Sequence, residues 1–251
     1  MTTIRNTCLA LQEFCEQQFR LIESAVPPPQ WVPWGNAYNW RYTEQTPTQM
    51  LVQKLARQIT GLKALDVLLA EGLLQEAGIM FRVLDEISED VLFVTTALVN
   101  NAWTENHTKY AAYFWCEDES DQQPPLRRKT IRAFANRVFN QQDPSSADAV
   151  GRNLHRAFSD FIHARSAPTM GMVSGPPAKF HLDGITDTSA RSQYIEQAPC
   201  YYYRAAVSVA VVAKVVLSDE LNAACYAELS DFERPHAALL FPVSHQNGFS
   251  V

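Results

Sequence analysis

Four polar side chains between residues 156 and 163 have types and spacing that suit acid–base chemistry. Arg156, Ser159, Asp160 and His163 fall on one stripe of a helix that the pattern predicts over residues 144–165, because successive helical residues turn by about 100°. Histidine exchanges protons near neutral pH, and arginine binds phosphate through a planar fork. Together they could cleave a phosphodiester bond without a metal ion.

In that reaction His163 would move the proton of an attacking 2′-hydroxyl or of the leaving oxygen, and Arg156 would stabilise the phosphate oxygens. Asp160 or Ser159 would orient the imidazole. On a straight helix, seven residues place Arg156 and His163 about 10 Å apart. Both reach one phosphate if the arginine side chain bends over, if the helix ends at His163, or if two chains pool their residues. The alternative is an ordinary polar helix face or a surface that a partner covers.

A second polar pair lies earlier in the chain. Arg82 and Glu86 are four residues apart, a spacing that favours an ion pair on one helix. If the two side chains face inward, they must be paired, because a lone buried charge is very costly. Two interpretations stay open: a partly buried pair that orients neighbouring helices, or a pair that takes part in chemistry.

Other catalytic classes lack their signatures. Residues 46–101 contain several carboxylates but no histidine, and a di-iron carboxylate bundle needs Glu-x-x-His on inward faces. The chain has no H-E-x-x-H, no phosphate-binding or dinucleotide-binding glycine motif and no G-x-S-x-G. His163, His181 and Asp183 would share a metal only through an unusual loop geometry. We therefore predict no metal site and no cofactor.

Composition describes a globular protein with an acidic balance. The chain has 251 residues, of which 47% are hydrophobic and 19% charged, and its net charge is −6. A broad nucleic-acid surface normally needs the opposite sign. A basic cluster at residues 127–137 is either a solvated helix face or a local RNA contact.

Cysteine usage and hydropathy indicate a cytoplasmic protein. The five cysteines form no C-x-x-C pair, which argues for a reducing compartment, and Cys8 and Cys15 share a helix face as expected for core residues. The N-terminus shows no signal-peptide pattern. The apolar stretch 205–217 is too short to span a bilayer and predicts a central buried helix. We expect no membrane partner.

Helical periodicity extends over most of the chain, and no strand alternation is strong enough to predict a sheet. Thr46, Pro47 and Gln49 form a good helix start, and a break near Gly72 or Gly78 would divide the long segment that follows into two antiparallel helices. Helices are predicted at 3–25, 46–101, 104–119, 128–140, 144–165, 189–217 with an interruption near Pro199, and 219–232.

Three segments lack this periodicity. Residues 26–46 form a Pro-rich aromatic loop, in which Trp31, Trp34 and Trp40 stack on a ligand, or else anchor the loop or cover an exposed edge of the core. Residues 167–188 form a long loop with one short extended piece at 178–182. Residues 236–251 form an irregular tail.

The segment Phe158–His163 resembles the L-S-x-[YF]-[VI]-H segment of DUF5677-type helical proteins, and Arg82–Glu86 is similar to their R-x-L-x-E segment. The resemblance covers about residues 54–169. These proteins are related to the HEPN superfamily, whose motif places four to six residues between an arginine and a histidine. Six separate Arg156 from His163 here, while Ala157 and Ala164 replace a frequent polar residue and a frequent proline.

The resemblance implies a helical bundle, dimerisation and, for active members, metal-independent RNA cleavage in defence or toxin–antitoxin systems. Arg156 and His163 would be catalytic, and Arg82 and Glu86 would be family-motif positions. Many HEPN-like proteins are inactive as RNases and act as binding or regulatory modules.

We therefore expect a single all-α domain over residues 1–251, a HEPN-like helical bundle with long irregular loops. Its expected function is in stress or defence, as a candidate metal-independent endoribonuclease. The alternative is a non-catalytic interaction or regulatory module. RNA, a second copy of the chain in a homodimer, and a protein partner are the expected partners.

Overall fold

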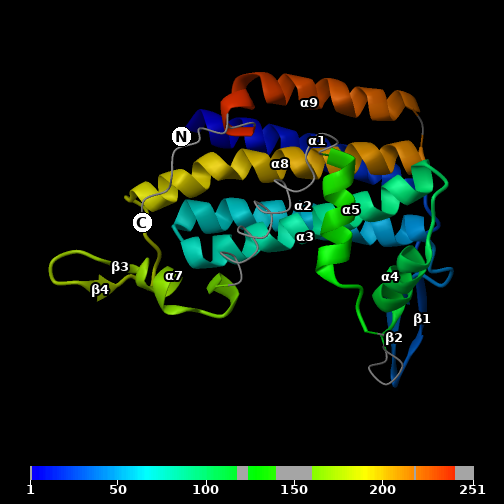
Figure 1. Ribbon diagram of the computed structural model, residues 1–251, viewed down its shortest axis with the longest axis horizontal. Coiled ribbons are helices and arrows are strands. Elements are labelled where there is room, and N and C mark those ends of the chain that lie inside the picture. Colours follow the sequence, from blue (N-terminus) through cyan, green and yellow to red (C-terminus); the bar gives the residue numbers. More distant parts are fainter. Residues whose placement is uncertain (1, 118–123, 140–159, 218, 241–251) are drawn as a thin grey trace.

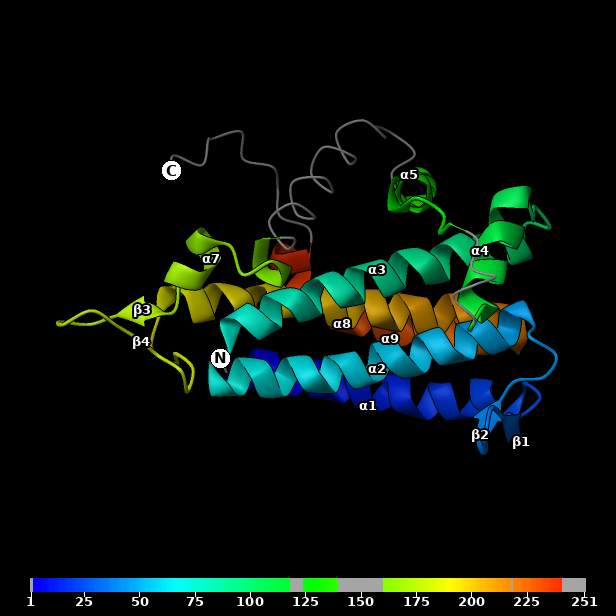
Figure 2. The same ribbon diagram turned by 90° about the horizontal axis from the view of Figure 1, so that it is seen from below.

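Long amphipathic segments bury their apolar stripes against one another and form a helical bundle. The computed structural model describes residues 2–117, 124–139, 160–217 and 219–240. In this part of the chain α8 packs against each of the other long helices, and the prediction of an all-α bundle is confirmed (Figures 1 and 2). The long helices are α1 (Thr2–Ser24), α2 (Pro47–Glu71), α3 (Leu74–Val99), α8 (Ser189–Val216) and α9 (Asp219–Leu240).

The start and end of α2 follow from its sequence. The backbone N–H of Gln49 donates to Thr46 Oγ1 (3.2 Å), and the N–H of Thr46 donates to Gln49 Oε1 (2.9 Å). Pro47 occupies the first turn, where its missing N–H costs nothing. Gly72 ends the helix in the left-handed region, at φ 71°. The predicted break is therefore at Gly72, and Gly78 lies inside α3.

The core lies between the long helices. Cys8 and Cys15 are buried in it as predicted, and burial raises the pKa of the Cys8 thiol to about 12. None of the helices in the described ranges is long and apolar enough to cross a bilayer. The largest fully buried apolar side chains are Phe81, Phe93, Ile22, Met50, Leu51, Leu55, Leu62, Leu65, Leu84, Ile131 and Leu229.

Two prolines lie inside helices, contrary to prediction. We predicted an interruption near Pro199, but α8 continues through it, and α9 continues through Pro235 to Leu240. A proline costs a helix one hydrogen bond. Pro199 is buried, and the packing of α8 against four other helices offsets that loss. The predicted tail is therefore wrong for residues 236–240, and 241–251 lie outside the described residues.

The aromatic segment at 26–46 contains a hairpin rather than an irregular loop. Strand β1 (Gln30–Trp34) pairs antiparallel with β2 (Ala37–Arg41), and Gly35 in the connecting turn has φ 55°. The two strands lack the usual alternation of apolar and polar residues, because the side of the hairpin that faces solvent carries aromatic residues. The sequence pattern therefore did not predict the hairpin. Figures 1 and 2 show the hairpin at one end of the bundle, and Arg41 of β2 contacts Glu117 just after α4 (Glu105–Trp115).

A buried histidine closes the first turn of α4. The backbone N–H of Thr104 donates to His107 Nδ1 (3.0 Å), and His107 Nε2 lies 3.2 Å from the carbonyl oxygen of Phe93. Its ring stacks on that of Phe93 with centroids 4.0 Å apart. A neutral imidazole with its proton on Nε2 satisfies both contacts, and burial lowers the pKa of His107. Helix α5 (Arg128–Phe139) then packs on α3.

The predicted loop at 167–188 has local structure and a fixed attachment. It contains most of α7 (Ser166–Met170) and a short hairpin of β3 (Val173–Ser174) with β4 (Lys179–Phe180), the latter inside the predicted extended piece. The N–H of Ile185 donates to the carbonyl of Gly72 (3.0 Å). A Cβ at Gly184 would lie 2.0 Å from a backbone oxygen of α2, so only glycine allows this approach.

Candidate functional site

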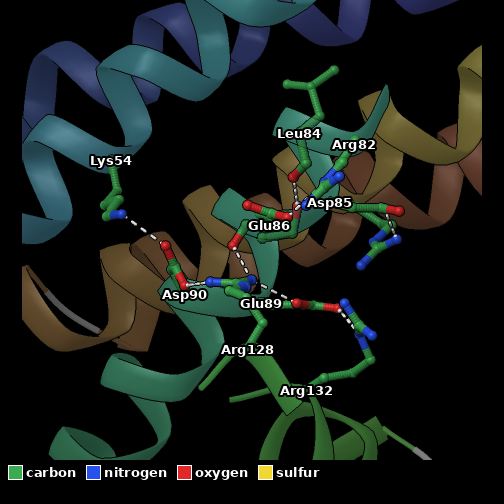
Figure 3. Close-up of polar contacts among 11 residues, drawn as sticks. Lys54, Arg82, Leu84, Asp85, Glu86, Glu89, Asp90, Arg128 and Arg132 are labelled. Carbon is green, nitrogen blue, oxygen red and sulfur yellow. Dashed lines mark hydrogen bonds and ion pairs between the residues drawn. The ribbon is translucent and has the colours of Figure 1, made fainter. Parts of the chain in front are cut away.

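A stripe of charged side chains runs along α3 and connects to charged residues of three other helices. Arg82, Asp85, Glu86, Glu89 and Asp90 are spaced three or four residues apart, which places them on one face of the helix (Figure 3). Each of the four carboxylates contacts a cation. The stripe therefore joins α3 to its neighbours.

Two arginines of α5 and one lysine of α2 neutralise the C-terminal half of the stripe. Lys54 Nζ lies 2.7 Å from Asp90 Oδ2, and Arg128 contacts Asp90 and, at 2.6 Å, Glu89 Oε2. Arg132 Nε lies 3.0 Å from Glu89 Oε1. The Asp90 and Glu89 side chains are only 8% and 12% exposed, so removing either partner would strand a charge in a poorly solvated site.

This arrangement corrects our interpretation of part of the basic cluster at 127–137. Arg127 and Lys129 are exposed, as on a solvated face, but Arg128 and Arg132 are not. We expected a solvated helix face or an RNA contact. Arg128 and Arg132 instead turn inward and bind carboxylates of α3, about 40 residues earlier in the chain. A sequence pattern shows that the cluster is basic, but the pairing across two helices depends on how those helices pack.

The predicted pair of Arg82 and Glu86 is confirmed. Arg82 Nε donates to Glu86 Oε1 at 2.9 Å within α3, and the two side chains are 20% and 30% exposed. The pair is thus partly buried. This geometry agrees with an orienting role, and both side chains keep some solvent access.

Asp85 contacts Arg204 of α8, a pairing across 119 residues that sequence reasoning missed. Burial raises the pKa of Asp85, although the charge of Arg204 acts in the opposite direction. The buried Tyr201 ring stacks on Phe81 with centroids 4.3 Å apart, and burial raises the pKa of Tyr201. A carboxyl group with a raised pKa can mark a functional site, and it can equally belong to a structural ion pair.

The segment Asp160–His163 meets α3 one turn before Arg82. The ring of Phe161 covers Gly78 so closely that a Cβ there would lie 3.0 Å from Phe161 Cγ. Glycine at position 78 therefore permits the contact. Phe161, in the described part of one resembling segment, thus contacts the helix that carries the other resembling segment, one turn before that segment begins.

His163 lies just beyond the end of a helix. The helical residues run to Ile162, and His163 and Ala164 form a turn in which Ala164 has φ 45°. The His163 side chain is exposed and makes no hydrogen bond to another described residue. Asp160 Oδ1 lies 3.3 Å from Arg165 Nε, so Asp160 pairs with arginine and does not orient the imidazole.

Arg156 and Ser159, the other two members of the predicted stripe, lie outside the described residues. The geometry from Arg156 to His163 therefore stays a prediction. Within the described ranges, no group of three or more His, Cys, Asp or Glu side chains is arranged to hold a metal ion. His181, one of the histidines considered for a metal site, instead contacts Ser174 Oγ through Nε2 (2.6 Å).

The aromatic hairpin lies at the other end of the bundle. Trp31 pairs across the strands with Trp40, and Pro33 pairs with Tyr38, so all four share the solvent-facing side. Trp31, Tyr38 and Trp40 are 55%, 58% and 58% exposed, and we call them the aromatic platform. The expectation that the tryptophans cover an edge of the core is wrong for Trp31 and Trp40.

Trp34 has a different environment on the opposite face of the hairpin. The guanidinium of Arg41 lies over its ring at 4.4 Å, and Arg41 also pairs with Glu117 at 2.9 Å. These contacts attach the hairpin to the end of α4 and leave the aromatic platform uncovered in this structure. Comparisons with family models, curated proteins and solved structures found no match to this chain.

Proposed function

We propose that this protein is a HEPN-like helical protein of a stress or defence system and a metal-independent endoribonuclease. The observation that carries the proposal is the contact of Phe161 with Gly78. It brings the Asp160–His163 segment to the helix that bears Arg82 and Glu86, as expected if the two resembling segments form one site. We place the protein in the cytoplasm, a proposal that its five free cysteines support.

In the proposed reaction His163 exchanges the proton of the 2′-hydroxyl or of the leaving oxygen. Its exposed imidazole can reach a phosphodiester in solution, and histidine is the side chain that most often acts as a general acid or base. Arg156 would stabilise charge on the phosphate oxygens. The end of the helix at Ile162 meets one of the conditions under which both groups reach one phosphate.

An RNA-cleavage assay in the presence of EDTA tests this proposal. We expect wild-type protein to cleave and His163→Ala to be at least about 100-fold slower, the usual contribution of general acid–base catalysis. His181→Ala is the matched control, since it removes a loop histidine to which the mechanism gives no role. Equal rates for wild type and His163→Ala would exclude the mechanism.

A second candidate function is a non-catalytic interaction module, and the aromatic platform favours it. Surface aromatic clusters mark interaction sites. The platform carries no charged residue, so two copies could approach there despite a net charge of −6 each. Aromatic side chains bury about 150–250 Å² each, so the exposed halves of three rings supply about 300 Å² per copy. Two copies would bury about 600 Å² through these rings, below the roughly 1,000 Å² of a specific interface, so the platform by itself supports only a weak, transient homodimer.

Sedimentation equilibrium tests the interaction module. If the platform forms the dimer, Trp31→Ser with Trp40→Ser should leave a monomer at concentrations where the wild type associates. Val67→Ser is the control, because Val67 is equally exposed (58%) on α2. An unchanged average mass in the double variant would rule out the platform as the interface.

A further inference from the structure

A cavity of about 310 Å³ lies where three helices end together near the N-terminus. The N-terminal part of α1, the C-terminal part of α2 and the N-terminal part of α8 surround it, and Figure 2 shows these three ends side by side. Most of its wall is apolar, with Ile4, Cys8, Leu69 and Ile195 among the lining residues. Its volume is that of a site for a small molecule.

Two of the charged groups at its rim neutralise each other. Arg5 forms a two-pronged pair with Asp66, with Nε to Oδ1 at 2.7 Å and Nη2 to Oδ2 at 2.8 Å. This geometry uses both carboxylate oxygens. Asp66 therefore presents little net charge to the cavity.

Arg191 is different, because its hydrogen bonds go to neutral acceptors. It donates from Nε to the carbonyl of Leu69 (2.9 Å), from Nη2 to that of Ala70 (3.2 Å) and from Nη1 to that of Thr186 (3.3 Å). A guanidinium has five N–H groups, so two remain. No carboxylate of the described residues forms an ion pair with it.

The local charge at Arg191 stays positive. The carbonyls that it contacts belong partly to the last turn of α2, where the helix dipole amounts to about −0.5 of an elementary charge. The guanidinium carries a full positive charge. About half a charge is thus left beside an apolar cavity.

We propose that this cavity binds a small monocarboxylate with an apolar body. The carboxylate accepts the two remaining N–H groups of Arg191, and the apolar body lies against Leu69 and Ile195. A dianion is disfavoured, because only about half a positive charge remains at Arg191 to balance it. The site is separate from the RNA-cleavage proposal and does not depend on it.

Calorimetric titration with octanoate, below its micelle concentration, tests the proposal, and 1-octanol is the uncharged comparator. A charge-assisted contact should make octanoate bind at least about tenfold more tightly than octanol. Ala70→Leu narrows the cavity from its wall and keeps the backbone carbonyl that Arg191 contacts, and it should weaken octanoate at least about tenfold. Arg191→Gln should remove the preference for octanoate, and Arg191→Lys should restore part of it.

Three results would overturn the proposal: no octanoate binding to the wild type, equal affinities for octanoate and octanol, or full binding by Ala70→Leu. Because Arg191 also caps α2, the melting temperature of each variant is measured first. If Arg191→Gln does not fold, the octanol comparison and Ala70→Leu decide the question by themselves.

Discussion

Replacing Gly78 by alanine probes the contact between the Asp160–His163 segment and α3. The new Cβ would lie 3.0, 3.1 and 3.2 Å from three ring carbons of Phe161, inside their optimal separation of about 3.5–4.0 Å. Inside a helix alanine is favoured over glycine by about 1 kcal/mol. Overpacking a core costs about 1–3 kcal/mol. We therefore expect the free energy of unfolding to fall by about 0–2 kcal/mol.

A double-mutant cycle separates these two effects. In a Phe161→Ala background the three atoms that the new Cβ would meet (Cγ, Cδ1 and Cδ2) are absent, and Gly78→Ala should stabilise the protein by up to about 1 kcal/mol. The coupling between the two positions is then about 1–3 kcal/mol. Urea unfolding of the four proteins, followed by circular dichroism, gives the midpoints, which are comparable if the slopes agree.

The cycle also reports on function. Displacing the segment by about 1 Å would move His163, and misplacement of that size can cost about 100-fold in rate. If Gly78→Ala changes stability equally in both backgrounds, within about 0.5 kcal/mol, the two positions are not coupled. The convergence on which the proposed function depends would then be wrong.

Three further predictions concern stability. Burial lowers the pKa of His107, so the neutral imidazole stabilises the fold above pH about 6.5, and this stabilisation is lost as the pH falls through the lowered pKa. The melting temperature should therefore fall in acid, and it should fall less in His107→Gln. An equal dependence of the melting temperature on pH in both proteins would contradict this. Asp90→Ala leaves the partly buried Lys54 without its carboxylate partner and leaves Arg128 with Glu89 alone, and it should cost about 2–4 kcal/mol in chemical unfolding, against less than about 0.5 kcal/mol for the exposed Asp231→Ala. Gly184→Ala places a Cβ against backbone at φ 91° and should cost at least about 2 kcal/mol by the same measurement; a wild-type midpoint would show that the loop can move away from α2.

Local patterns predicted much of the helical framework. Thr46 and Gln49 mark the start of α2 through their own hydrogen bonds, and Gly72 marks its end through its backbone conformation. Both signals depend on residues that are close together in the sequence, so they can be recognised without knowledge of the fold. The prediction at Pro199 was wrong, because the packing of a buried helix outweighs the tendency of proline to interrupt it.

The sequence predicted those contacts of the candidate site that join residues close together in the chain. The pair of Arg82 and Glu86 follows from a spacing of four residues. The pairing of Asp85 with Arg204, and the seating of Phe161 on Gly78, depend on helix packing and leave no periodic signal in the sequence. The aromatic hairpin was missed for another reason, since its exposed face is apolar and breaks the usual alternation.

The central claim is that His163 performs metal-independent cleavage of RNA from a segment seated on α3. Its most direct test is the initial rate of RNA cleavage in EDTA by wild type and His163→Ala, on a ribo-oligonucleotide and on its 2′-O-methyl counterpart. We predict cleavage of the first substrate alone, with a cyclic phosphate end, and a loss of at least about 100-fold in His163→Ala. Cleavage that persists in His163→Ala, or that does not need the 2′-hydroxyl, would contradict the account.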